Sequence, residues 1–205
     1  MSIEPASPEE TYTPNQVENW DETKFRRSPH GIKVQIALLA WRVIYVLLFR
    51  TSPRPFHAWR RMILRLFGAK IAHKVRVYPS ARIWAPWNLE MHENSCLGEE
   101  VDCYCVDQIT IGKNTTVSQR ATLCAATHDF TLLHFPLTRA PVVLGEFVWI
   151  AAEVFVMPGV TVNDGTVIGV RSLVTEDMPA WKIATGSPCK VVRERQLQAN
   201  QLIDR

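Results

Sequence analysis

Among the six histidines, His128 has the position in the sequence that most favours chemistry. It closes a regularly patterned stretch and is followed at once by Asp129 and Phe130, where the pattern gives way to a longer segment. Segments extruded from a regular scaffold often carry function, and imidazole exchanges protons near neutral pH. The position therefore predicts a general base, although a single histidine is more commonly a surface residue without a catalytic role.

The five cysteines predict buried thiols rather than a redox or metal centre. They form an odd set without a CxxC pair, and no secretory signal precedes them, so neither disulfides nor a metal site is expected. Cys124 lies four residues before His128. A small thiol of this kind usually fills a core, and we assign Cys124 no catalytic role.

The elements that must position His128 appear as a six-residue apolar period. Such a period suits a short strand and a turn, repeated, with three sides closing a coil of about eighteen residues whose aliphatic side chains point inward. Stacked coils then pair through their backbones. Residues 70–192 are predicted to form an all-β parallel β-helix of about six coils. The period runs through Ile71, Val77, Ile83, Leu89, Leu97, Cys103, Ile111, Val117, Leu123, Leu144, Ile150, Val156, Val162, Ile168 and Val174.

The period is interrupted three times. It slips by two residues after Leu89 and again after Cys103, and by more than a dozen after Leu123. Stacked coils tolerate a long insertion only by extruding it as a loop. We expect residues 129–141 to form that loop, with His128 at its root.

The flanks of the period differ in charge. Residues 1–30 are predicted to be a flexible acidic and polar tail, and residues 193–205 a C-terminal tail. Residues 24–74 contain twelve Lys or Arg and no Asp or Glu, which favours contact with an anionic partner such as a membrane surface. The lack of a secretory signal predicts a cytoplasmic protein, and peripheral contact with the inner face of the membrane stays open.

Basic amphipathic helices are expected over residues 31–69. In the first, residues 36–49 are apolar except for Arg42, and these fourteen positions fall short of the roughly 20 that a spanning helix needs. In the second, residues 56–67 place apolar residues and arginines on different sides of a helix. The two helices either lie in a membrane interface or cover the open end of the coils. The sequence leaves both interpretations open.

The sequence resembles the hexapeptide-repeat acetyltransferases, and most narrowly the colanic-acid biosynthesis acetyltransferases of extracellular polysaccharide pathways. The resemblance runs from about Lys33 to Arg195. Its most specific segments are VSQRATLCAATHDF (117–130) and GSPCKVVRER (186–195). The resemblance implies a left-handed coil, which spacing alone does not establish.

By this resemblance the chain is an O-acetyltransferase that moves an acetyl group from acetyl-CoA to a sugar hydroxyl. The matching histidine of the family is the general base, so His128 takes the proton of the acceptor. A backbone N–H of the turn from Trp149 to Ala152 stabilises the oxyanion. The implied coenzyme-binding residues are Trp149, Ala152, Val170, Thr175, Lys190 and Arg193, of which the last two meet the phosphates.

The sequence departs from the family at two of these places. Val170 replaces a smaller residue, and Glu176 stands where a lysine is frequent, which weakens the expected phosphate contact at that end. A solvated basic tail is the alternative interpretation of Lys190 and Arg193.

The acceptor side and the assembly also follow from the resemblance. Asp102 and Asp107 correspond to polar residues that bind sugar hydroxyls or orient the base, although both also suit ordinary turns. The family is trimeric with each site between two chains, so we expect a homotrimer in which His128 faces the coenzyme groups of a neighbour. The expected acceptor is a sugar or a lipid-linked oligosaccharide, without a nucleic-acid partner.

Two other functions on the same fold stay open. A γ-type carbonic anhydrase binds zinc through three histidines of two chains, and His92 and His128 are 36 residues apart. The slips between them place the pair at different phases of the period, and the Arg-x-Asp and Gln-Asp-Gly elements of that class are missing. A non-catalytic scaffold is the other alternative, against which His128, Lys190 and Arg193 argue.

Overall fold

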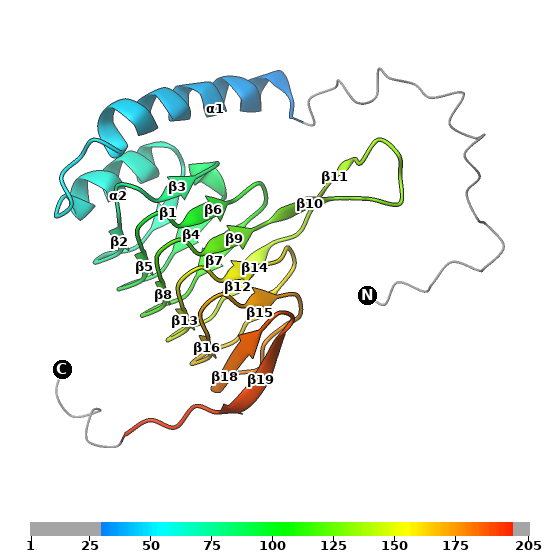
Figure 1. Cartoon of the computed structure of the whole chain (residues 1–205). Helices are drawn as coiled ribbons and strands as arrows, with labels where there is room; N and C mark the ends of the chain where they lie inside the picture. Colours follow the sequence, from blue (N-terminus) through cyan, green and yellow to red (C-terminus); the bar gives the residue numbers. More distant parts are fainter. Residues whose placement is uncertain (1–29, 199–205) are drawn as a thin grey trace, which may run out of the picture.

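The strands wind into a solenoid of about six turns with three faces of parallel strands (Figure 1). The computed structural model describes residues 30–198; most of the predicted acidic tail, and residues 199–205, lie outside the described residues. The first face contains β1 (Lys70–Ile71), β4 (Leu89–Met91), β7 (Ile109–Ile111), β12 (Val142–Leu144) and β15 (Thr161–Val162). The second contains β2 (Arg76–Val77), β5 (Cys96–Leu97), β8 (Thr116–Val117), β13 (Trp149–Ile150), β16 (Val167–Ile168), β18 (Lys182–Gly186) and β19 (Cys189–Glu194). The third contains β3 (Arg82–Ile83), β6 (Asp102–Tyr104), β9 (Thr122–Cys124), β14 (Phe155–Val156) and β17 (Leu173–Val174).

The predicted left-handed parallel β-helix with a helical N-terminal segment and one extruded loop is confirmed. Its core consists of the apolar ladders that the six-residue period predicts, and these side chains are buried. The coils approach closely: the Gly112 amide donates to the Leu144 carbonyl at 2.8 Å, and a Cβ on Gly112 would overlap the backbone of Gly145. Glycine at this corner therefore permits the coil spacing.

One detail of the predicted period is wrong. The ladder residue of the first face is Met91, which pairs with Ile71 and Ile111, so the first slip precedes Leu89 instead of following it. A short 3-10 helix, η4 (Pro86–Asn88), fills the extra length. All three insertions therefore lie at the same corner, between the third and first faces.

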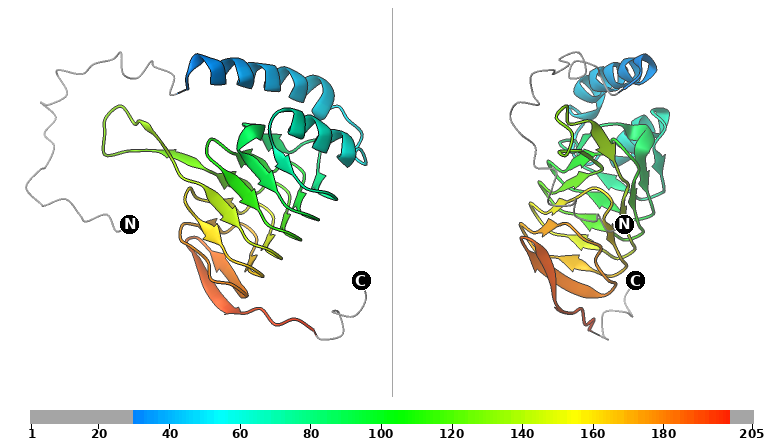
Figure 2. Two further views of the ribbon diagram at one scale, coloured as in Figure 1. Left: turned by 180° about the vertical axis from the view of Figure 1, so that it is seen from behind. Right: turned by 90° about the vertical axis from the view of Figure 1, so that its right-hand side faces the viewer.

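The third insertion is a two-stranded hairpin. Strand β10 (Ala126–His128) pairs antiparallel with β11 (Leu137–Arg139), and His128 lies opposite Leu137. The hairpin extends from the solenoid in both Figure 1 and Figure 2. His128 is thus held at the end of a paired strand, at the root of the projecting loop.

The N-terminal helices cover the open end of the first coil. Helix α1 (Ile32–Ile44) continues into the π-helical turn η3 (Tyr45–Phe49), and α2 (His57–Leu66) follows. Trp41 is buried, and its Nε1 donates to the Ile83 carbonyl at 2.7 Å. The continuous segment Ile32–Phe49 is 18 residues long with a mean hydropathy of 1.9, so by length and composition alone it passes as a membrane span. It is longer than the fourteen-residue apolar stretch, 36–49, noted in the sequence.

The arginines of α2 point toward the solenoid. Arg60 Nε donates to the Val77 carbonyl at 2.6 Å, Arg61 to Val75 at 2.9 Å, and Arg65 Nε to Ile71 at 2.8 Å. These bonds satisfy carbonyls at the edge of the first coil, which has no preceding coil to pair with. The opposite side of α2 exposes apolar side chains, namely Trp59, Met62 and Leu66.

The C-terminal end closes with an antiparallel hairpin of β18 and β19. Strand β19 continues to Glu194, so the last strand includes residue 193, where the sequence predicted the beginning of a tail. The hairpin carries Lys190 and Arg193 on its outer strand. The two ends of the solenoid are thus covered by different structures, helices at one and a hairpin at the other (Figure 2).

Candidate active site

His128 is solvent-exposed, and one of its ring nitrogens is held by the loop. Its Nδ1 lies 2.6 Å from the Phe135 carbonyl oxygen. A carbonyl can only accept, so Nδ1 carries the proton in this contact, and in the neutral ring the lone pair is on Nε2. Phe135 has a positive φ of 43°, and its carbonyl faces the imidazole at the root of the hairpin. This is the arrangement that a general base requires.

Asp129 shapes the loop beside the histidine. Its carboxylate accepts hydrogen bonds from the Thr131 amide at 2.9 Å and the Thr131 hydroxyl at 2.6 Å. These bonds lower the pKa of Asp129. The Asp129 amide in turn donates to the Pro136 carbonyl at 3.0 Å. The residue therefore fixes the turn that presents His128.

A groove lies between α1 and the third face, next to the corner from which the hairpin projects. Its volume is about 320 Å³, and its lining includes Arg42, Tyr45, Arg82, Trp84, Asp102 and Tyr104. Asp102 accepts a hydrogen bond from Arg82 at 2.9 Å. The rings of Trp84 and Tyr104 meet edge to face at 5.9 Å. The groove thus combines aromatic surfaces with an ion pair.

The groove also contains an unsatisfied polar atom. The Tyr45 hydroxyl is buried and has no hydrogen-bond partner within the described residues, and burial raises the pKa of Tyr45. Asp107, by contrast, is not part of this lining: its Oδ1 accepts from the Gln108 amide at 2.7 Å. The structure therefore places Asp102 in the groove, and Asp107 in the local turn that the sequence left as an alternative.

The residues expected at the acetyl group lie on the second face and at the corner that follows it. Trp149 is 49% exposed, and its Nε1 donates to the Ser118 hydroxyl at 2.9 Å. The amides of Trp149 and Ala151 already donate to carbonyls of the next coil. The Ala152 amide donates to no acceptor between residues 30 and 198. It is therefore the donor available to an oxyanion.

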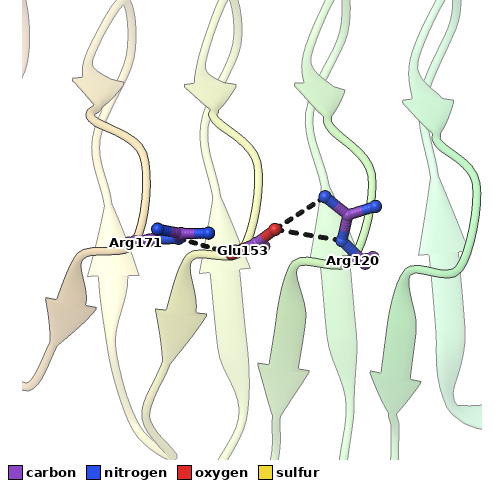
Figure 3. A network of polar contacts seen from close by, with 3 residues as sticks. All are labelled: Arg120, Glu153 and Arg171. Carbon is purple, nitrogen blue, oxygen red and sulfur yellow. Dashed lines mark hydrogen bonds and ion pairs between the residues drawn. The ribbon is translucent and has the colours of Figure 1, made fainter.

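Ala152 and Val170 occupy the same corner in adjacent coils, since the Arg171 amide donates to the Ala152 carbonyl at 3.0 Å. Beside them, Glu153 accepts hydrogen bonds from Arg120 Nε at 3.0 Å and from Arg171 Nε at 2.6 Å. Figure 3 shows the carboxylate between the two guanidinium groups, each on a neighbouring coil. Arg171 first, and then Arg120, lower the pKa of Glu153. This network ties three coils together next to the expected coenzyme track.

Glu153→Gln should lower the melting temperature by about 2 °C at pH 7, because exposed ion pairs contribute little. The pKa of Glu153 is depressed below its usual value near 4.5 in the folded chain. Its contribution is therefore present above that value and is lost as pH falls through the depressed value. Thermal melts from pH 7 to pH 3 should show the difference from the parent shrinking. Glu146→Gln is the control, and an undiminished difference at pH 3 contradicts the ion-pair origin.

Residues expected at the coenzyme phosphates gather at the C-terminal end of the solenoid. Lys190 Nζ lies 3.2 Å from a carboxylate oxygen of Glu176. Glu176 directly follows Thr175 in the chain. Arg193 is exposed on the same strand as Lys190, opposite Ile183. Glu176, the departure noted in the sequence, thus neutralises one of the two cations.

The sequence analysis missed Arg195. Its NH1 donates to the Gly165 carbonyl at 2.7 Å and the Phe147 carbonyl at 2.8 Å, and its guanidinium lies 5.8 Å from the centre of the Trp181 ring. These contacts fasten the chain after β19 to the coils. No local pattern in the sequence signals them, because both carbonyls are more than 25 residues away in the chain.

His128 and Ala152 lie at opposite ends of the third face. Ala152 precedes strand β14, whereas His128 follows strand β9, and these two strands are neighbours in that face. A strand of the third face therefore separates the imidazole from the Ala152 amide within one chain. The two halves of the expected site are brought to different corners.

Among the residues that the structure describes, no group of three or more His, Cys, Asp or Glu side chains could hold a metal ion such as zinc. His92 lies on the first face, with its Nε2 3.3 Å from a Glu90 carboxylate oxygen. His128 instead lies in the hairpin, at the corner between the third and first faces. The pair considered for a carbonic anhydrase is therefore not assembled within the chain.

Comparisons with known proteins bear on this site. No protein-family model matches the chain. It is 41% identical over 169 residues to a protein of Escherichia coli (strain K12) described as a colanic acid biosynthesis acetyltransferase, WcaF, covering 82% of this chain and 91% of the relative. A maltose O-acetyltransferase from Clostridium difficile 630 has a similar structure, with a TM-score of 0.74 and 24% identity over 82% of this chain and 90% of the other.

A second solved structure also matches. It is a hexapeptide-repeat acetyltransferase of Vibrio cholerae O1 biovar eltor, crystallised with acetyl coenzyme A, with a TM-score of 0.73 and 18% identity over 82% of this chain and 92% of that chain. At such low identity the two structural matches establish the fold only. The match in sequence to WcaF is long enough to include both the hairpin with His128 and the corner with Ala152.

Proposed function

Because the chain belongs to the hexapeptide-repeat acetyltransferases, we propose that it moves the acetyl group of acetyl-CoA to a hydroxyl of a sugar, with His128 as the general base. The observation that carries the assignment of the base is the contact of His128 Nδ1 with the Phe135 carbonyl, at 2.6 Å. In the neutral ring this contact places the lone pair on Nε2 of an exposed side chain, as proton abstraction requires. The rest of the site supplies binding and charge stabilisation.

The reaction divides among residues of this chain as follows. His128 Nε2 takes the proton from the acceptor hydroxyl as its oxygen attacks the carbonyl carbon of the thioester. The Ala152 N–H, which has no other acceptor among the described residues, donates to the oxyanion that forms. When the carbon–sulfur bond breaks, the imidazolium returns its proton to the departing thiolate. The proton is thus conserved, and the base is restored.

The site is proposed to form between chains of a homotrimer. Within one chain a strand of the third face separates His128 from Ala152. The hairpin projects from the solenoid (Figure 1), and in the proposed trimer it meets the corner of Ala152 and Val170 on a neighbouring copy. A solution mass of three chains, measured by analytical ultracentrifugation, is the expected result.

The acceptor is proposed to be a sugar, presented on a lipid carrier at the inner face of the cytoplasmic membrane. The α1 groove supports a saccharide because aromatic faces and charged hydrogen-bonding groups converge there, at Trp84, Tyr104, Arg82 and Asp102. The Tyr45 hydroxyl offers a further partner. The relative in colanic acid biosynthesis supports a polysaccharide precursor.

The test is an assay of the purified protein with acetyl-CoA and a panel of sugar acceptors. Release of free CoA that depends on an acceptor is the expected result, with the acetylated sugar identified by mass spectrometry. Metal-dependent hydration of CO2 would favour the carbonic anhydrase alternative. Neither activity, over a broad acceptor panel, would favour a scaffold.

Lys190→Ala and Glu176→Gln should change coenzyme affinity in opposite directions. Removing Lys190 deletes a charge-assisted phosphate contact and should weaken CoA binding about tenfold. Glu176→Gln releases Lys190 from its 3.2 Å ion pair and should tighten binding by up to about fivefold, since exposed pairs are weak. Calorimetric titration with CoA measures both. Lys113→Ala, on a different corner, is the control; equal affinities in all four proteins contradict the phosphate role.

A further inference from the structure

Helix α1 turns a continuous apolar strip toward solvent. Its exposed side chains succeed one another at helical spacing, on the side opposite the buried Trp41. Their exposed fractions are 69% for Ile32, 62% for Ile36, 64% for Leu39 and 48% for Val43, and the strip continues in η3 with Val46 at 56% and Leu47 at 62%. A helix whose outer side faced only water would carry polar residues there.

Helix α2 extends this strip. Phe56, directly before α2, and Trp59, Met62 and Leu66 within it are exposed apolar side chains, whereas its arginines donate to carbonyls of the first coil. The Trp59 Nε1 donates to the Leu48 carbonyl at 2.9 Å, which joins the two helices edge to edge. Both views of Figure 2 place them together at one end of the solenoid. We call the exposed apolar residues of α1, η3 and α2, together with Phe56, the cap surface.

The charge around the cap surface selects among partners. Lys33, Arg42 and Arg50 are exposed along α1 and η3, and residues 24–74 contain no acidic residue. An apolar surface bordered by cations matches the acyl chains and anionic headgroups of a lipid bilayer. A water-facing surface would be expected to carry acidic residues as well.

We propose that the cap surface docks on an anionic lipid bilayer, with α1 lying in the plane of the membrane. The docking deepens the proposed function, and rests on it in placing the acceptor site next to the membrane. Arg42 and Trp84 line both the α1 groove and an adjoining cavity of about 500 Å³ that continues along α1 to Ile32 and Ile36. The groove with Asp102 is thus continuous with the cap surface, so a lipid-linked sugar can enter from the bilayer.

The packing of α1 favours this orientation over a membrane span. Leu38, Trp41 and Phe49 are buried against the rest of the protein, at 7%, 2% and 0% exposure. A spanning helix would have to leave these contacts and the Trp41 hydrogen bond to Ile83. In the docked orientation the buried side stays packed while the exposed side enters the interface.

The test uses flotation of the full-length protein with vesicles of phosphatidylcholine, with and without phosphatidylglycerol. The protein should float with the anionic vesicles at low salt, and less at high salt. Val43→Gln/Leu47→Gln, at two exposed positions outside the groove and the adjoining cavity, should lower the partition coefficient about tenfold, because two apolar contacts with the bilayer are lost. Leu197→Gln, an equally exposed leucine far from the cap surface in sequence, should float like the parent.

Several results would overturn the proposal. One is flotation of the double variant at the parent level. Another is a protein that stays in native membranes after alkaline carbonate extraction, which would indicate that α1 and η3 span the bilayer. A third is loss of a larger oligomer in the double variant without loss of vesicle binding, which indicates a second copy as the occupant.

Acetyl transfer to a soluble sugar, measured on the same preparations, separates the two proposals. Equal activity of parent and double variant on the soluble acceptor, with flotation lost only in the variant, supports docking by the cap surface. A protein that floats but never releases CoA refutes the proposed function and leaves the docking intact. A protein that is active but never floats does the reverse.

Discussion

His128→Ala is expected to lower kcat/KM for acetyl transfer about a thousandfold, within the range that a positioned general base contributes. CoA affinity should change less than twofold, because the ring lies on the hairpin, whereas the residues proposed to bind the phosphates, Lys190 and Arg193, lie on β19. The loss should appear in kcat rather than KM, since the proton is transferred only on the way to the transition state. Steady-state kinetics, together with calorimetric titration of CoA, measures both quantities.

His134→Ala is the matched control for this prediction. His134 lies in the same hairpin, and its removal tests whether any histidine change disturbs the loop. It should retain activity within about threefold of the parent. A thousandfold loss in both variants would mean that the loop has collapsed. Full activity of His128→Ala would remove the base from the mechanism.

The tautomer of His128 offers an independent readout. If Nδ1 donates to Phe135, nitrogen NMR of the free protein should show a protonated Nδ1 and an unprotonated Nε2 in the neutral ring. The opposite tautomer would leave no lone pair toward the acceptor. The kinetic and spectroscopic results together distinguish a base from a residue that only binds substrate.

The fold was predictable from the sequence because its repeat is local. Inward-facing aliphatic residues recur at every side of every coil, so the period indicates the solenoid without knowledge of tertiary contacts. The first slip was misplaced because Leu89 and Met91 are both buried, at 1% exposure each, two residues apart on one strand. Alternate residues of a strand share a face, so counting cannot decide which of them continues the ladder.

The N-terminal helices show where local patterns are insufficient. The helices were expected over residues 31–69, and the first begins at Ile32, directly after the extended Gly31. The apolar run over residues 36–49 marked only part of that helix. Amphipathic spacing in α2 indicated two sides, and could not indicate which side meets the solenoid. That choice depends on carbonyls of the first coil, which attract Arg61 and Arg65.

The candidate site was predictable to the extent that its residues lie at breaks in the repeat. His128 stands out because the period stops there. Asp102 was named only through the resemblance to the family, and the structure places it in the groove with Trp84. The contact of His128 with Phe135 depends on how the loop folds back, and the Arg195 contacts span a large part of the chain. Such long-range contacts leave no mark in a local pattern.

Arg60→Met is expected to destabilise the fold by about 3 kcal/mol, because it leaves several buried acceptors without a donor, each at a cost of about 1 kcal/mol or more. Arg60 is fully buried. Its donors reach the carbonyls of Val77 at 2.6 Å, Pro53 at 2.8 Å and Arg54 at 2.5 Å, and the Ser52 hydroxyl at 2.8 Å. Methionine fills similar space without a donor and leaves these acceptors unsatisfied.

The same network joins the turn between η3 and α2 to the first coil, so its loss should release the cap surface as a unit. Arg61→Met removes a single bond to the Val75 carbonyl and should cost only about 1 kcal/mol. Urea unfolding followed by circular dichroism compares the two variants with the parent. Equal midpoints for Arg60→Met and the parent would show that the buried guanidinium does not hold the helices to the solenoid. A large loss in Arg60→Met alone ties the orientation of α1 to one side chain of α2.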